Sequence, residues 1–376
     1  MEDTSNTLTI AYMNVRGQTG LDLVKQLQID NFIKSYKLDI LHCQEINILE
    51  DSFNNCENIT SSFNILSNNA QNKYGTCRFV SNQYLTENFK TDSNGRVLAF
   101  NIGNITFCNV YMHSGNDPIM KNGRENYAAE IIPQILINAK DCGCVGGDWN
   151  AIIDNRDATK NVNQKQSKCL KRLVNNFSWV DSFRHLYPNT QQFSRYYDNV
   201  HGEGASRLDR NYHFGNLQIL EAYYVGVAFS DHLTFIIKIK LPSSMSKLTS
   251  PKSRPLFKSK PCVIQDSKFK SKLKEYFTLW LQVRQAGLET LTWWEIVVKP
   301  GIKRLLIERG QEMNKENTGI LNLLQIRQSY LVRKLQLGHL DRLVELKIVQ
   351  NQITAWHVNE SEKVKLQARG DEMNET

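Results

Sequence analysis

The chain of 376 residues is 41% hydrophobic and 22% charged, and it carries a formal net charge of +8. This length allows one large hydrophobic core with residues left for a second element, and the composition is ordinary for a globular protein. Residues 1–7 lack the basic and apolar regions of a signal peptide. No apolar run approaches the ~20 residues that cross a bilayer, so we expect neither secretion nor a membrane partner.

Charge and cysteine usage favour an intracellular protein with a basic tail. Residues 1–241 hold 23 Lys and Arg against 24 Asp and Glu, whereas residues 242–376 hold 23 against 14. This asymmetry favours a polyanionic partner for the tail, although a solvated basic helical region is an alternative. The eight scattered cysteines predict reduced, mostly buried thiols, as in the cytosol or nucleus.

The first 45 residues predict a strand, a helix and a second strand. Residues 8–15 alternate loosely, residues 21–36 carry apolar side chains at helical spacing, and residues 39–43 are a short apolar run. This order places neighbouring strand ends at one edge of a sheet, where ligands often bind. Asn14 and Glu45 lie at these ends. Glu45 can bind a hard cation, although a lone Glu is more often a surface loop residue.

Residues 50–140 predict short strands followed by a helix. We expect strands around residues 63–66, 75–80, 85–89, 96–102 and 105–111, with Asn94-Gly95 as a hairpin turn. The last of these strands ends at Tyr111, whose hydroxyl can donate to a phosphate; the alternative is a half-buried strand tyrosine. Residues 122–140 are helical in pattern, and Pro133 breaks or kinks the helix.

The stretch Gly-Gly-Asp-Trp-Asn at residues 146–150 carries the clearest chemical signal. An apolar run leads into it, and the glycine pair predicts a tight turn at a strand end. In extended backbone, Asp148 and Asn150 point to the same side. Such a pair suits a water or a phosphate oxygen, because the carboxylate accepts a proton while the amide donates. A simple turn with an Asn cap explains the five residues equally well.

Residues 168–241 predict a helix, a hairpin and two closing strands. The helix covers residues 168–177, and a new unit begins at residues 180–184. The hairpin pairs residues 193–197 with a strand that starts at residue 206, around a glycine-containing polar tip that holds His201. The closing strands cover residues 222–229 and 233–241, with Ser230, Asp231 and His232 between them.

The last third predicts a linker and a helical tail. Residues 242–265 are basic and proline-containing, as in a semi-extended linker. Asp266 is placed to cap a helix, and a second helical stretch holds Trp293-Trp294 and breaks near Pro300-Gly301. From Thr318 to about Trp356, leucines recur at helical spacing, which is more often a packing seam than a ligand site. The sequence thus predicts domains at residues 1–241 and 266–376, joined by the linker.

The polar strand ends form an ordered set. Asn14, Glu45, Tyr111, Asp148 with Asn150, Ser-Arg-Leu-Asp at 206–209 and Ser-Asp-His at 230–232 follow one another along the chain. This order resembles the endonuclease/exonuclease/phosphatase superfamily and, within it, the endonuclease domain of LINE-type (non-LTR) retrotransposon polyproteins, over roughly residues 8–240. The resemblance implies a four-layer α/β sandwich of two mixed β-sheets flanked by helices, followed by an α-helical C-terminal extension. That extension is similar to the helical region before the reverse transcriptase.

The resemblance also implies a role for each matched residue. Asp148, His232, Asn150, Asp209 and Tyr111 would be catalytic; Glu45, Asn14 and Asp231 would hold Mg²⁺, or Mn²⁺ in its place; Ser194, Arg207, Ser230 and His201 would contact the substrate. Asp148 would orient or deprotonate the attacking water, and a protonated His232, oriented by Asp209, would stabilise charge on the phosphate. Oxygen ligands with few carboxylates suit Mg²⁺ better than zinc.

The sequence departs from the family in two places. Met112-His113-Ser114-Gly115 replaces the proline-containing loop that many relatives carry after the tyrosine, and the hairpin tip at residues 198–205 differs in length and sequence among relatives. The geometry of the phosphate loop and the choice of target site are therefore open. By resemblance, the tip enters a groove of the DNA.

The resulting expectation is a nuclear, Mg²⁺-dependent endonuclease, made in the cytoplasm, that nicks one strand of duplex DNA and leaves a 3′-hydroxyl, as in target-primed retrotransposition. Element RNA is a further candidate partner for the basic helical tail. A reverse transcriptase is expected in the full element, but no Tyr/Phe-x-Asp-Asp box occurs in this chain. Two alternatives stay open: an abasic-site repair endonuclease of the same superfamily, and a catalytically idle protein that binds nucleic acid or a partner.

Overall fold

The computed structural model describes residues 6–17, 22–46, 57–68, 75–115, 117–160, 166–198, 202–242, 261–285 and 287–374. The chain divides into two compact units. One comprises Met1–Ser250 with Arg327–Glu362, and the other comprises Pro251–Ile326 with Lys363–Thr376. The predicted domain bounds at residues 241 and 265 stay a prediction.

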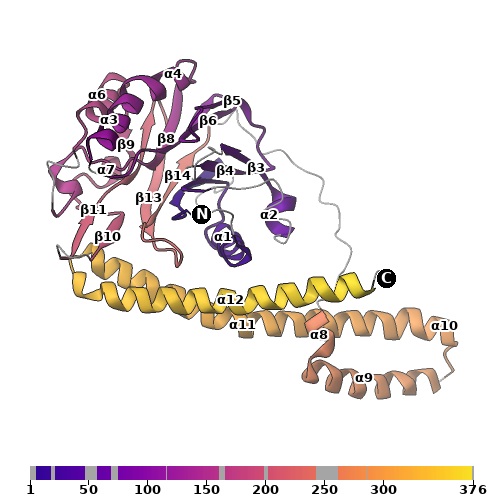
Figure 1. Cartoon of the computed structure of the whole chain (residues 1–376). Helices are drawn as coiled ribbons and strands as arrows, with labels where there is room; N and C mark the ends of the chain where they lie inside the picture. The colour runs from indigo at the N-terminus through magenta and orange to yellow at the C-terminus, as the bar shows by residue number, and fades with distance from the viewer. Residues whose placement is uncertain are drawn as a thin grey trace. The chain divides into compact units, whose positions relative to one another are not determined.

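Two mixed sheets form the body of the first unit (Figure 1). Among the described residues, the first sheet has the order β13 (Ile219–Val225), β14 (Thr234–Lys240), β1 (Thr7–Asn14), β2 (Ile40–Gln44), β4 (Thr76–Ser81), β3 (Phe63–Asn68). The second has the order β5 (Glu87–Thr91), β6 (Val97–Ile102), β7 (Ile105–Tyr111), β8 (Cys142–Asp148), β12 (Asp209–Phe214), β9 (Val180–Asp181). A two-stranded ribbon joins β10 (Arg195–Tyr197) to β11 (Gly204–Ser206).

The sheets lie face to face, and helices cover their outer faces. Strands β1 and β2 contact β7 and β8 across the interior. Helix α1 (Leu23–Tyr36) buries Ile29, Phe32 and Ile33 against the first sheet, and α2 (Glu57–Ser62) is next to β3. The second sheet is covered by α3 (Pro118–Asn126), α4 (Ile132–Ile135) and α6 (Lys168–Asn176), while α7 (Ser182–Leu186) packs on β12 and β13 (Figure 1). The predicted four-layer sandwich is confirmed.

Parallel strand pairing in each sheet brings two strand ends to the same edge. Strand β1 is parallel to β2, and β7 is parallel to β8, so each pair ends at the same edge. The remaining ladders are antiparallel, which makes both sheets mixed. Polar side chains tie the sheets together inside the core, because Asn109 donates to the carbonyls of Cys43 (2.8 Å) and Cys77 (3.1 Å).

The glycine pair before Asp148 does not form the predicted turn. Gly146 and Gly147 lie within β8, which continues to Asp148. A Cβ on Gly146 would lie 2.6 Å from the Tyr12 ring, and a Cβ on Gly147 would lie 2.0 Å from the Val110 carbonyl oxygen. These glycines therefore allow close approach of the facing sheet and the neighbouring strand.

The helix predicted at residues 122–140 begins earlier and is composite. It runs from α3 through a π-helical turn, η2 (Tyr127–Ile131), into the short α4. Pro133 lies just after the π-helical turn, so the helical path changes type beside the proline and continues to Ile135.

The tail is helical, as predicted, but its long segment is two helices. Helix α11 (Lys299–Gln336) ends before Gly338, whose φ of 92° is left-handed, and η5 (Leu340–Arg342) leads into α12 (Leu343–Asn374). A glycine in this conformation is a common helix end, which the leucine spacing does not reveal. Pro300 falls where a π-helical turn, residues 294–298, passes into α11, so the helical path changes type there without the predicted break.

The second unit contains α8 (Pro261–Gln265), α9 (Ser267–Gln285), α10 (Thr290–Trp293), η4 (Trp294–Val298) and most of α11. Asp266 caps α9 as predicted, accepting from the Phe269 amide at 2.9 Å. Predicted linker residues 243–260 lie outside the described residues. Within the described part of the chain, no helix is long and apolar enough to span a bilayer, and the described cysteines with assigned burial are free thiols.

Candidate active site

The predicted strand ends meet at one edge of the sandwich. Within the second sheet, Tyr111 is paired with Asp148 on parallel strands, and Asp209 is paired with Asp148 on the antiparallel β12. Asn14 ends β1 in the other sheet and donates across to Asp148 Oδ2 at 3.0 Å. Sheet pairing and one inter-sheet hydrogen bond thus bring together residues separated by up to 195 positions.

Asp148 is fully buried and held by amide donors. Its Oδ1 accepts from the Asn150 backbone amide at 2.9 Å, and its Oδ2 accepts from the Asn14 and Asn150 side chains, each at 3.0 Å. Burial, and next the negative charge of Asp209, raise the pKa of Asp148 to about 6. A carboxylate with its pKa close to neutrality suits the transfer of a proton to and from water.

Asn150 reaches Asp148 by a different route from the one predicted. Its φ is 44°, so the backbone is left-handed and not extended. The side chain folds back, and its amide donates to both Asp148 Oδ2 and the Met112 carbonyl, each at 3.0 Å. Asparagine tolerates this conformation better than most residues. The predicted proximity of the two side chains is present, but a turn produces it.

Asp209 and His232 form a buried pair beside Asp148. Asp209 Oδ2 lies 2.8 Å from His232 Nδ1, and Asp148 Oδ2 lies 4.0 Å from the same nitrogen. Burial alone would lower the pKa of His232, but the negative charges of Asp209 and then Asp148 raise it to about 9. The imidazole is therefore cationic at neutral pH, with Nδ1 engaged by Asp209.

The Glu45 side chain links the two sheets through hydrogen bonds. Its Oε1 accepts from Asn14 Nδ2 at 3.0 Å and from the Tyr111 hydroxyl at 3.2 Å, and its Oε2 accepts from the Gly17 amide at 3.1 Å. Burial, followed by the charge of Glu45, raises the pKa of Tyr111 well above its usual value. Tyr111 is therefore a neutral hydrogen-bond donor at physiological pH.

The charges of the site fit a divalent cation. Three carboxylates, those of Glu45, Asp148 and Asp209, are connected through short contacts to one imidazolium, which leaves excess negative charge in a buried place. Asp209 Oδ1 is buried without a hydrogen-bond partner among the described residues. Asp148, Asp209 and His232 have ligand atoms within 4.8 Å of one another. Of these groups only the carboxylate oxygens could hold a divalent cation, because a protonated His232 offers no lone pair.

Asp231, predicted as a cation ligand, is bound by arginines. Arg195 contacts Asp231 Oδ2 through Nε at 3.0 Å and through a terminal nitrogen at 2.9 Å, and Arg16 Nε lies 3.8 Å from Oδ1. Burial would raise the pKa of Asp231, but Arg195, His232 and Arg16 hold it below its usual value. A cation ligated by Asp231 would have to share it with Arg195. The role of Arg16 was missed because nothing in the sequence marks a charged loop residue as facing the site.

Three residues predicted to contact substrate support the site from within. The Ser194 hydroxyl is fully buried and accepts from the amides of Leu208 and Asp209, both at 2.9 Å, and so fixes the start of β12. The Ser230 hydroxyl accepts from the His232 amide at 3.1 Å. Arg207 is 1% exposed. These placements give the three residues positioning roles, and His201 lies outside the described residues.

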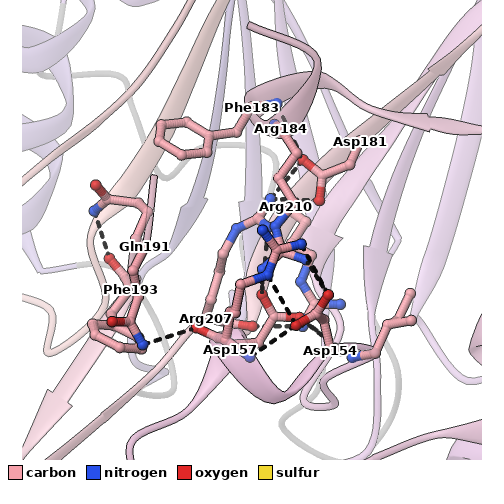
Figure 2. Close-up of polar contacts among 12 residues, drawn as sticks. Asp154, Asp157, Asp181, Phe183, Arg184, Gln191, Phe193, Arg207 and Arg210 are labelled. Atoms are coloured by element: carbon pink, nitrogen blue, oxygen red, sulfur yellow. Dashed lines mark hydrogen bonds and ion pairs between the residues drawn. The ribbon is translucent and has the colours of Figure 1, made fainter. Parts of the chain in front are cut away.

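Arg207 belongs to a buried ionic cluster, formed by Asp157, Asp181, Arg184, Arg207 and Arg210 (Figure 2). Arg207 contacts both oxygens of Asp181 at 2.6 Å, while Arg184 lies 2.7 Å from Asp157. Because Arg207 and Arg210 flank Asp209 in sequence, the cluster anchors the segment that presents Asp209. The Ser-Arg-Leu-Asp stretch at residues 206–209 therefore includes an arginine that is paired inside the fold.

Comparison with solved structures identifies the fold. An AP endonuclease from Archaeoglobus fulgidus superposes with a TM-score of 0.51 at 17% identity, over 61% of this chain and 98% of that one. The AP endonuclease LMAP from Leishmania major gives 0.53 at 18%, over 64% and 90%. Truncated Caenorhabditis elegans TDP2 gives 0.46 at 17%, over 62% and 98%, a score too low to support an argument. This chain has the fold of endonuclease/exonuclease/phosphatase proteins.

The sequence itself has no detectable match among known families. No protein-family model matches it, and no curated protein matches it. The structural likeness is at low identity and establishes the fold alone, because one fold hosts many functions.

Proposed function

We propose that the protein is a divalent-cation-dependent DNA endonuclease that hydrolyses a phosphodiester in one strand of a duplex. The observation that carries the proposal is the convergence of polar strand ends from both sheets on Asp148, with His232 held protonated beside it. An acid–base pair with separated pKa values, joined to an excess of carboxylate oxygen, suits phosphodiester hydrolysis.

In the proposed reaction, Asp148 orients the attacking water and accepts its proton as oxygen bonds to phosphorus. The bond from phosphorus to the 3′-oxygen breaks, that oxygen takes a proton from solvent water and leaves as a 3′-hydroxyl, and Asp148 returns its proton to solvent. His232 donates a hydrogen bond from Nε2 to the phosphate, where negative charge grows. Tyr111 supplies a second donor, and Asn150 keeps Asp148 in place.

We place the cation, Mg²⁺ or Mn²⁺, on Glu45 and Asn14, with Asp231 as the third residue. The bound cation would neutralise phosphate charge and stabilise the leaving oxygen. Glu45 supports this assignment because three donors orient its carboxylate while acceptor capacity remains.

We propose the LINE-type assignment on the sequence resemblance alone. On this basis the substrate is duplex DNA in the nucleus, the 3′-hydroxyl serves as a primer, and the basic residues 242–376 add sequence-independent affinity for DNA or element RNA. Such affinity would weaken as salt concentration rises. A reverse transcriptase would be supplied by the full element.

The test is nicking of supercoiled plasmid by the full chain, with Mg²⁺ and then with EDTA. We expect nicked circles only with the cation, and we expect a DNA polymerase to extend the nicks without prior end repair. Asp148→Asn should abolish nicking, whereas Asp141→Asn, an exposed aspartate just before β8, should retain it. Nicking by Asp148→Asn at the wild-type rate would contradict the assignment of the base.

A second candidate, suggested by the AP endonuclease neighbours, is incision at abasic sites. Matched duplex oligonucleotides with and without one abasic analogue separate the two functions. Preferential cutting at the abasic position favours repair, and equal cutting of both duplexes favours the nicking function. Binding of nucleic acid without cutting in any cation would leave the idle-protein alternative.

A further inference from the structure

The loop between β13 and β14 carries three residues of the candidate site. It runs from Gly226 to Leu233 and includes Ser230, Asp231 and His232. Its second half is anchored to the ribbon, because the Leu233 amide donates to the Ser194 carbonyl at 2.6 Å and Arg195 bridges to His232. The first half needs partners from elsewhere.

Those partners come from a helical arm, residues 327–362, which belongs to the first compact unit although it lies about a hundred residues further along the chain. A Cβ on Gly226 would lie 3.1 Å from Val332 Cγ2 and 3.3 Å from Gln328 Nε2, so α11 packs closely on the start of the loop. Val227 is 4% exposed and joins the core under the first sheet.

Gln350 of α12 is the polar link between the arm and the loop. Its Nε2 donates to the Val227 carbonyl at 2.8 Å and lies 3.5 Å from the Ser230 carbonyl, a longer contact. One amide therefore spans the turn that precedes Asp231. The Ser230 hydroxyl in turn accepts from the His232 backbone amide at 3.1 Å, so the link ends one hydrogen bond away from the backbone of His232.

We propose that Gln350 is a positioning residue for catalysis: it fixes the turn at residues 227–230 and thereby the orientation of His232. The arm packs through apolar residues, namely Leu331, Val332, Leu335, Leu346, Val349 and Ile353, each buried. Apolar packing stabilises the docked arm but is non-directional, whereas the hydrogen bond from the Gln350 amide requires a defined orientation of its acceptor. Removing the amide should loosen the loop while leaving the arm docked.

The test compares Gln350→Met, which keeps length and shape without the donor, with Gln352→Met, an exposed glutamine on the same helix. The first readout is amide hydrogen exchange. In Gln350→Met we expect protection of the His232 amide to fall about tenfold, the change that loss of one hydrogen bond produces. The Leu233 amide and the α12 amides should keep wild-type protection, and Gln352→Met should match wild type throughout.

The second readout is nicking kinetics, and this part rests on the proposed function. Gln350→Met should lower kcat about tenfold with KM within about twofold, because misplacement of a catalytic group affects the reaction more than binding. A second variant, Gln350→Glu, places a carboxylate against two carbonyls and should lower kcat further. An inactive wild type would end the proposed function while hydrogen exchange still decides the role of Gln350.

Two results would overturn the inference. One is wild-type protection of the His232 amide in both Gln350 variants. The other is loss of protection along α12 together with a fall in the melting temperature, which would make Gln350 a packing residue of the arm.

Discussion

The ionic cluster of Figure 2 gives a sharp prediction, because two neighbouring aspartates contact it, one from a buried position and one from a partly exposed position. Asp157 is 1% exposed and lies 2.7 Å from Arg184, 3.5 Å from Arg207 and 3.6 Å from Arg210. It also accepts from the amide of residue 154 at 3.2 Å. Asp154 contacts Arg184 at 3.3 Å, but its side chain is 34% exposed. Replacing each by Asn removes one negative charge at nearly the same place.

The expected costs differ because solvent reaches only one of the two sites. Breaking a buried pair by removing one partner costs about 3–5 kcal/mol. In the variant, Arg207 would keep its pair with Asp181 and Arg184 would keep its pair with Asp154. We therefore expect Asp157→Asn to lower the free energy of unfolding by about 3–4 kcal/mol. An exposed pair contributes about 0–1 kcal/mol, and Asn caps a helix as well as Asp does, so Asp154→Asn should cost less than about 1 kcal/mol.

Equilibrium urea denaturation of the full chain measures the difference. With a slope of about 2–3 kcal/mol per molar urea, Asp157→Asn should lower the midpoint by about 1–2 M and Asp154→Asn by much less. Equal midpoints for the two variants would refute the reasoning, because they would show that burial of Asp157 does not increase the contribution of its ion pairs to stability. A large loss in Asp154→Asn alone would place the stabilising contact at the surface.

Two further predictions concern the site and its support. Activity should rise with pH as Asp148 loses its proton near pH about 6, and fall as His232 loses its proton near pH about 9. Asp209→Asn should move the basic limb of the pH–rate profile toward lower pH, because it removes the charge that raises the pKa of His232. An unmoved limb would show that another group titrates there. Gly147→Ala should destabilise the protein by more than about 3 kcal/mol, because its φ is 135° and the new Cβ would meet the Val110 carbonyl. Gly287→Ala, at a φ of 103° with nothing within 4 Å, should cost only about 1–2 kcal/mol in the same denaturation assay.

The sequence was informative where strand ends decide the outcome. Apolar runs that stop at a polar residue placed Asn14, Glu45, Tyr111 and Asp148 at strand ends, and strand pairing then brought them to one edge of the sandwich. Alternation and helical spacing are local properties, so the main sheets and helices could be predicted from them. How these sheets and helices contact one another could be predicted only from the family resemblance.

The sequence failed where a residue's role depends on what packs against it. Arg207 sits in a motif with Asp209 and so was expected at the substrate, yet its charge is satisfied inside the fold by Asp181. Gly146 and Gly147 read as a turn, because a glycine that allows close packing looks the same in sequence as one that allows a reversal. Gln350 gave no signal at all, since its partners lie 120 or more positions away.

The strand ends of the site are also where local preference and structure disagree most. Of the described non-glycine residues with left-handed backbone, Arg16, Glu45 and Asn150 lie one or two positions after the ends of β1, β2 and β8. Each such residue costs about 1 kcal/mol or more. These conformations turn the chain at the strand ends, where Glu45 accepts from Tyr111 of the facing sheet and Asn150 folds back onto Asp148. Cross-sheet bonds, from Asn14 to Asp148 and from Tyr111 to Glu45, offset that cost. A site assembled this way depends on the whole sandwich, which is why no short stretch of the chain specifies it by itself.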